Sequence, residues 1–216
     1  MTLFIAPIIE GQTESKCIST LLERIWIELF HADPSDLRVL QPNRTSRSSF
    51  VSKRKPELTE KIEQAVRLLK PHLGSGAADR GFVLILIDAE EDCPKSLAPV
   101  LLERAIETRS DAEICCVMPK RQLENWFMAA ADSLQGVNGL PLNLKPPPPD
   151  PEQRSGTKWL KTELRRGNPK NSYSKTTDAI EFVRKMNLQQ CRDNSPSFDK
   201  LCRELAKRLP PPPDSS

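Results

Sequence analysis

Carboxylate side chains follow directly after the most apolar stretch of the sequence. Six apolar residues, 82–87, lead into Asp88, Glu90, Glu91 and Asp92. Two like charges about 4 Å apart repel by roughly 4 kcal/mol at an effective dielectric constant near 20. Acids that converge in a folded protein therefore need protonation, a nearby Lys or Arg, or a bound cation.

A second pair of acids, Glu10 and Glu14, follows another apolar segment at residues 3–9. Ligands of parallel α/β sheets bind beyond the carboxyl ends of the strands. If the two strands are neighbours in the sheet, Glu10, Asp88 and Glu90 meet at one rim. Carboxylates without histidine or thiolate partners are hard ligands that favour Mg²⁺ or Mn²⁺. Such ions polarise phosphoryl oxygens and activate water, so the pattern predicts metal-dependent phosphate chemistry. Glu14 would bind a second metal or act as general base.

A simpler interpretation of these acids remains open. Acidic residues after a strand often cap the next helix or stay hydrated, and Asp92 fits this well because Pro94 follows it by two residues. The turn "EGQTE" has the same alternative. The two acidic segments together, each at the end of an expected strand, favour the metal site.

The elements that would position these acids alternate between strand and helix. Short apolar segments predict strands, and apolar residues at helical spacing predict the helices between them. This order implies an α/β fold with a mainly parallel sheet covered by helices on both faces. Pro7 suggests that the first strand is an edge strand or carries a bulge. We expect strands at residues 3–9, 38–41, 82–87 and 112–118, and helices at 14–29, 56–69, 94–109 and 120–134.

The sequence changes character after residue 135. Residues 1–135 form the expected α/β domain, and residues 136–156 are a proline-rich surface loop. Residues 157–209 contain short amphipathic segments, which predict a small helical extension packed on the domain. The tail, 210–216, is expected to be disordered.

Composition narrows the class of protein. The 216 residues carry a formal net charge of +3, six cysteines and two histidines. The cysteines form no C-x-x-C pair, which argues against structural zinc, and the scarcity of histidine argues against a Ser-His-Asp triad. No membrane helix or signal peptide is expected, and the cysteine usage indicates a reducing cytoplasm.

Two basic regions flank the acidic segments along the chain. The first carries Arg44, Arg47, Lys53 and Arg54 in an expected loop, and the second begins at Lys158 and ends at Lys175. Such regions could hold a nucleic-acid backbone beside the metal, with Lys175 contacting a phosphate or the transition state. They could equally be solvated charge runs.

Several motifs resemble the Toprim domain of topoisomerases, primases and nucleases. "IIEGQTE" is similar to its Glu-Gly turn in the extended form of the overcoming-lysogenization-defect nucleases, and "LILIDAEED" to its Asp-x-Asp motif. "RQLENWF" resembles a later segment of those nucleases, which implies a metal-binding role for Glu124. The segments "EGQTE", "LIDAEEDCP", "ENWFMA", "YSKTTD" and "SPSF" also resemble, in order, those of a bacterial Toprim-like family, over about residues 3–206.

The resemblance implies a Toprim-like fold and Mg²⁺-dependent phosphodiester hydrolysis of nucleic acid, beside an ATPase partner in defence against mobile DNA. The chain departs from the family pattern where Glu90 replaces the second Asp, and Asp92 could supply a ligand instead. Two alternatives remain. The chain could be a non-catalytic binding or regulatory subunit, or an enzyme acting on small phosphates such as nucleotides.

Overall fold

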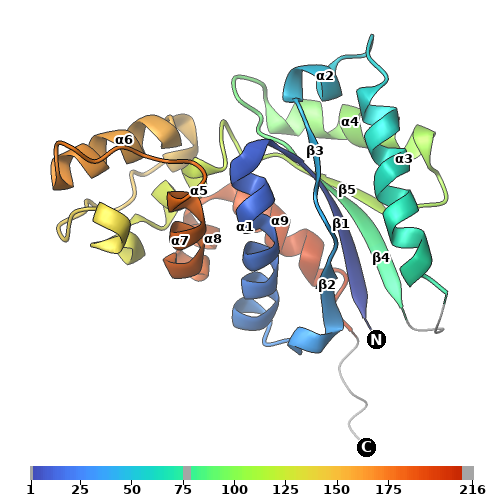
Figure 1. Ribbon diagram of the computed structural model, residues 1–216, viewed down its shortest axis with the longest axis horizontal. Helices are drawn as coiled ribbons and strands as arrows, with labels where there is room; N and C mark the ends of the chain where they lie inside the picture. Colours follow the sequence, from blue (N-terminus) through green and yellow to red (C-terminus); the bar gives the residue numbers. More distant parts are fainter. Residues whose placement is uncertain (1, 75–78, 211–216) are drawn as a thin grey trace, which may run out of the picture.

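The computed structural model describes residues 2–74 and 79–210, but not the side chains of Gln12, Thr13, Glu14 and Lys16. The order of strands and helices agrees with the α/β pattern expected from the sequence (Figure 1). Within the described ranges, no helix is both long and apolar enough to cross a bilayer.

The centre of the molecule is a parallel sheet of five strands in the order β2-β1-β4-β5, with β3 also paired to β1. Alternate side chains of the central strands face opposite sides, which gives two separate apolar layers. The strands are β1 (Leu3–Glu10), β2 (Leu37–Val39), β3 (Asn43–Thr45), β4 (Arg80–Leu86) and β5 (Ile114–Val117).

Pro7 does not mark an edge strand, contrary to the sequence-based expectation, because β1 lies inside the sheet. The carbonyl of Ile5 accepts a hydrogen bond from the main-chain N–H of Leu40. Residue 7 faces the same side, two positions on. β2 pairs with β1 only up to Ile5, and β3 pairs with β1 only from Ile8 onward, so no strand lies opposite residue 7 on this side. The missing proline N–H therefore costs the sheet no hydrogen bond.

One face of the sheet is covered by α2, α3 and α4 (Figure 1). The segment that the sequence suggested to be a basic loop contains β3 and the short α2. Ser46 begins α2 by accepting a hydrogen bond from the main-chain N–H of Ser49. The bounds are α2 (Arg47–Val51), α3 (Glu57–Leu69) and α4 (Pro94–Thr108).

The other face is covered by α1 and by the helices that follow β5 (Figure 1). The first helix changes to a π-helical turn at Ile25–Leu29 instead of continuing as expected. The helical extension packs on the domain, with contacts between α1 and α7 and between α5 and α6. The bounds are α1 (Gly11–Arg24), α5 (Glu124–Ala129), α6 (Gly156–Gly167), α7 (Asp178–Lys185), α8 (Leu188–Asn194) and α9 (Pro196–Ala206).

The proline-rich segment between α5 and α6 is more than a surface loop. Leu140, Leu144 and Pro151 are buried, and the buried carboxylate of Glu152 accepts a hydrogen bond from the main-chain N–H of Ser197, 2.9 Å away. The segment therefore ties the extension to the domain. Most of the tail expected to be disordered, residues 211–216, lies outside the described residues. The whole arrangement is a Rossmann-like α/β fold.

Candidate functional site

The two acidic segments meet at the carboxyl edge of the sheet. β1 and β4 are adjacent and parallel, with Ile9 opposite Leu86. Glu10 is the last residue of β1, and Asp88 follows the end of β4 by two residues. The strands are therefore neighbours, which is the condition for the acids to converge, and their ends place both acids at one edge.

Arg47, at the start of α2, binds the loop that carries the second acidic segment. Its Nε donates to the carbonyl of Asp88 at 2.9 Å, and one terminal nitrogen donates to the carbonyl of Ala89 at 3.2 Å. The same guanidinium pairs with Asp92, and it lies 3.5 Å from a carboxylate oxygen of Glu90. Arg47 thus holds the loop against α2 and neutralises part of its charge.

The surroundings of Glu10 perturb its ionisation. Its side chain is half-buried, and Oε2 has no hydrogen-bond partner among the described residues. Burial raises the pKa of Glu10, and the negative charge of Glu90 raises it further. The main-chain N–H and charge of Arg47 and the charge of Lys175 offset this in part. These four residues therefore share one electrostatic environment.

Glu124 lies beside this group, at the start of α5, and is almost completely buried. Its Oε1 accepts a hydrogen bond from the hydroxyl of Tyr173 and lies 3.2 Å from Nζ of Lys175. Its Oε2 has no partner within the described part of the chain. Burial and the charge of Glu124 raise the pKa of Tyr173, so this residue stays protonated and acts as a donor.

Asp88 is buried and has a structural contact of its own. Its Oδ1 accepts a hydrogen bond from the main-chain N–H of Leu123 at 2.9 Å. Leu123 is the N-cap residue of α5, so Asp88 satisfies one of the free N–H groups at the beginning of that helix. The link places the end of β4 next to the helix that carries Glu124. The sequence left open that an acid after the strand caps the next helix. Asp88 does cap a helix, but that helix is α5 and not α4, which follows directly in the chain.

The acids do not form a ready-made metal cage. Among the side chains that the structure describes, no three of the His, Cys, Asp and Glu type gather closely enough to hold a metal ion. The side chain of Glu14, the predicted second ligand or base, lies outside this description. Mg²⁺ is usually held by one or two carboxylates, several waters and the phosphates of its substrate. Glu10 and Glu124 each keep one buried carboxylate oxygen without a hydrogen-bond partner among the described residues.

The five residues predicted to contact nucleic acid lie in two different environments. Arg47 belongs to the acidic site, as described above. Arg44 is exposed on β3, Lys53 and Arg54 are exposed just after α2, and Lys158 is exposed in the first turn of α6. In the described ranges, none of these four forms an ion pair with the acids of the sheet edge.

Two features of the site were not anticipated from the sequence. Arg47 was expected to contact a phosphate, but its guanidinium faces two carbonyls and two carboxylates of its own chain. Tyr173 was given no role at the site, but it donates to Glu124. The sequence offered only one signal for this arrangement, the closeness of Tyr173 and Lys175 in the motif "YSKTTD".

A comparison with protein-family models matched residues 9–206 to a domain of unknown function, DUF4276. Comparisons with curated proteins and with solved structures found no significant match. The matched range begins just before Glu10 and contains both acidic segments, Glu124 and Lys175. Because the match covers nearly the whole chain, this protein belongs to the DUF4276 family.

Proposed function

We propose that this chain is a Mg²⁺- or Mn²⁺-dependent phosphodiesterase that cleaves nucleic acid. The observation that carries the proposal is the pair of buried carboxylate oxygens, on Glu10 and Glu124, that have no hydrogen-bond partner among the described residues. A buried, unpaired carboxylate oxygen is costly, and a divalent cation is a strong compensating partner. The pair lies at the carboxyl edge of a parallel sheet, where ligands of such folds bind.

Each residue would have a distinct role. Glu10, Asp88 and Glu90 would hold the metal, with Asp92, Glu124 or Glu14 as further ligands or, for Glu14, as general base. The bond from Leu123 holds the carboxylate of Asp88 beside the start of α5, and a carboxylate offers about four acceptor sites. When bound, the metal would polarise a phosphoryl oxygen and activate water.

The cations of the site would act on the substrate. Lys175 pairs with Glu124, and its positive charge also lowers the pKa of Glu10, so its ammonium acts on both acids. A phosphate bound there would meet a fixed positive charge, which stabilises the charge that develops during hydrolysis. The motif resemblance to Toprim nucleases points to the same chemistry, and it also suggests an ATPase partner and a role in defence against mobile DNA.

A non-catalytic role is the second candidate, and one contact favours it. Arg47 already neutralises Glu90 and Asp92, the two acids that would most easily complete a metal site. A chain with this arrangement could bind nucleic acid or a partner ATPase without cleaving anything.

The test is cleavage of plasmid, single-stranded and duplex substrates with Mg²⁺, Mn²⁺ or chelator. Glu10→Gln removes the central charge at constant size, and the control is Glu91→Gln, on the same acidic loop but highly exposed and paired with Arg121. Metal-dependent cleavage that is lost in Glu10→Gln and kept in Glu91→Gln is the expected result. Metal-independent binding without cleavage would support the second candidate, and turnover of nucleotides alone would indicate a small-phosphate enzyme.

A further inference from the structure

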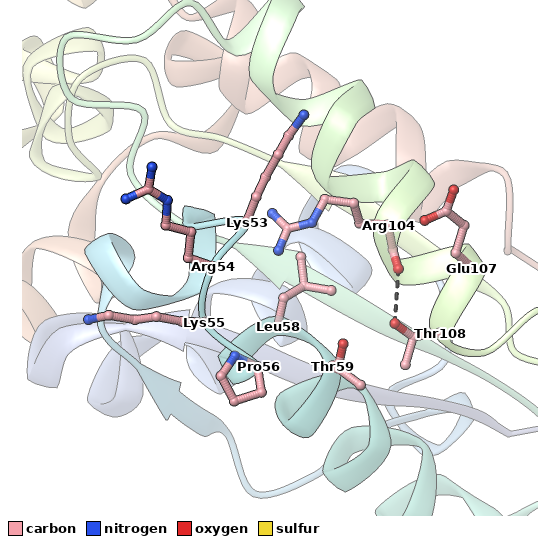
Figure 2. A pocket seen from close by; sticks show the side chains of 9 residues that line it. All are labelled: Lys53, Arg54, Lys55, Pro56, Leu58, Thr59, Arg104, Glu107 and Thr108. Carbon is pink, nitrogen blue, oxygen red and sulfur yellow. Dashed lines mark hydrogen bonds between the residues drawn. The ribbon is translucent and has the colours of Figure 1, made fainter.

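A positively charged pocket of about 470 Å³ lies between the end of α2, the start of α3 and the side of α4 (Figure 2). Its charged lining consists of four cations and one acid, Glu107; the cations are Lys53, Arg54, Lys55 and Arg104. In the described part of the chain, none of the three consecutive cations 53–55 forms an ion pair. The pocket therefore presents an excess of positive charge to solvent.

Arg104 makes the pocket a fixed feature and not only a charged surface loop. Its two terminal nitrogens donate to the carbonyls of Val51 and Ser52, each at 3.0 Å. These bonds connect α4 to the end of α2. A guanidinium has five N–H donors in a planar fork, so donors remain for an anion. Figure 2 shows its guanidinium pointing toward the side of the pocket where Lys53 lies.

The consecutive cations are displayed rather than buried. Lys53, Arg54 and Lys55 are all exposed, and Lys55 donates to the hydroxyl of Ser49 at 3.1 Å. Exposed Lys and Arg groups that meet phosphates release bound counterions, and this is the main source of affinity for a nucleic-acid backbone. An open, wet, cationic pocket suits a phosphodiester group better than an apolar ligand.

α2 connects this pocket to the acidic site. Arg47 at its start holds the acidic loop, and Val51 at its end holds Arg104. Five residues of helix rise about 7.5 Å at 1.5 Å per residue. Successive phosphates of one duplex strand are spaced by about 3.4 Å along the axis, so α2 spans roughly two nucleotide steps.

We propose that the pocket of Lys53, Arg54, Lys55 and Arg104 binds a backbone phosphate of a polynucleotide at least about two nucleotides away from the phosphate at the acidic site. The inference rests on the proposed function for the identity of the second phosphate. It deepens that function, because it makes the substrate a polymer and not a mononucleotide or a small diester.

The test measures oligonucleotide binding in chelator, where no cleavage occurs. The variant Lys53→Gln/Arg54→Gln removes two exposed cations, and the control Arg67→Gln/Lys70→Gln removes two at the other end of α3. The affinity of the pocket variant for longer oligonucleotides should fall by at least about tenfold. Its log–log salt slope should fall by about 0.7 to 0.9, the value for the one phosphate contact that the pocket provides. Oligonucleotides shorter than about three nucleotides should bind the variant and the wild type equally.

Three results would overturn the proposal. The pocket variant could bind like the wild type, or the control could lose as much affinity, which would indicate only general surface charge. A mononucleotide could also bind as tightly as the longer oligonucleotides and be lost in the same variant.

A second assay separates this proposal from the proposed function. A small aromatic phosphodiester is too short to reach the pocket, so the pocket variant should hydrolyse it at the wild-type rate, while its KM for polynucleotides rises and its kcat is kept. If no substrate is cleaved but the binding results hold, only the proposed function fails. If the small diester is cleaved but the binding results do not hold, only the pocket proposal fails.

Discussion

The buried carboxylate of Asp88 allows capping of α5 to be separated from metal binding. Asp88→Asn keeps an oxygen that can accept from the N–H of Leu123, whereas Asp88→Ala leaves that N–H without its partner. A hydrogen bond to a charged group contributes about 1.5–3 kcal/mol and a neutral one about 0.5–1.5 kcal/mol. We therefore expect Asp88→Asn to lower the free energy of unfolding by about 1 kcal/mol, and Asp88→Ala by about 2–3 kcal/mol.

The activity of the two variants should behave differently from their stability. Both lose the charged ligand, so metal-dependent cleavage should fall by a similar, large factor in both. Urea unfolding gives the stabilities, and cleavage is measured well below the unfolding midpoint of the weaker variant. Glu91→Gln, a highly exposed acid on the same loop, serves as the control and should change neither quantity much.

Two outcomes would contradict this reasoning. If Asp88→Ala is as stable as Asp88→Asn, the bond to Leu123 does not stabilise the start of α5. If Asp88→Asn cleaves as well as the wild type in the same metal concentration, Asp88 is not a metal ligand, and the site must be rebuilt around Glu10.

Two further predictions concern stability. The pKa of Glu10 is raised in the folded protein, so ionisation of Glu10 destabilises the fold. This destabilisation is absent below the ordinary pKa of 4.5 and complete above the raised pKa. The urea midpoint of unfolding of Glu10→Gln should therefore be higher than that of the wild type at neutral pH, and the two midpoints should be equal in acid. A difference between the midpoints that grows as the pH falls would refute this. A Cβ on Gly156 would lie 2.4 Å from the main-chain carbon of Glu124 and 2.5 Å from the nitrogen of Asn125. Gly156→Ala should cost about 1–3 kcal/mol, and an unchanged Tm would show that α6 does not need this close approach to α5.

The sequence alone was sufficient for the layout of the fold. The short apolar run 82–87 favoured a buried strand, and the 3.6-residue spacing of Leu58, Ile62 and Val66 favoured a helix with one buried face. Alternation of the two requires a parallel sheet, and a parallel sheet brings the ends of β1 and β4 to one edge. Local periodicity therefore predicted the edge at which the acids lie, and the strand order seen in the structure made Glu10 and Asp88 neighbours.

Short elements escaped prediction, because their local signals are weak. β3 and α2 lie in a segment rich in Arg, Lys and Ser, and they form because β1 has an open partner position beyond Pro7 and Phe50 is buried under α2. The central position of β1 was also missed, since a single proline gives no information on which hydrogen-bonding side of a strand is occupied.

The partners of the charged residues were decided by the tertiary structure. Arg47 and Lys53 look alike in the sequence, but Arg47 reaches the loop at 88–92 and Lys53 faces a solvent-filled pocket. Lys175 and Tyr173 meet Glu124 only because the extension packs on the domain. Residue type determines which chemistry is available, but the sign and strength of the field at each carboxylate depend on distances and burial, which exist only once the chain has folded.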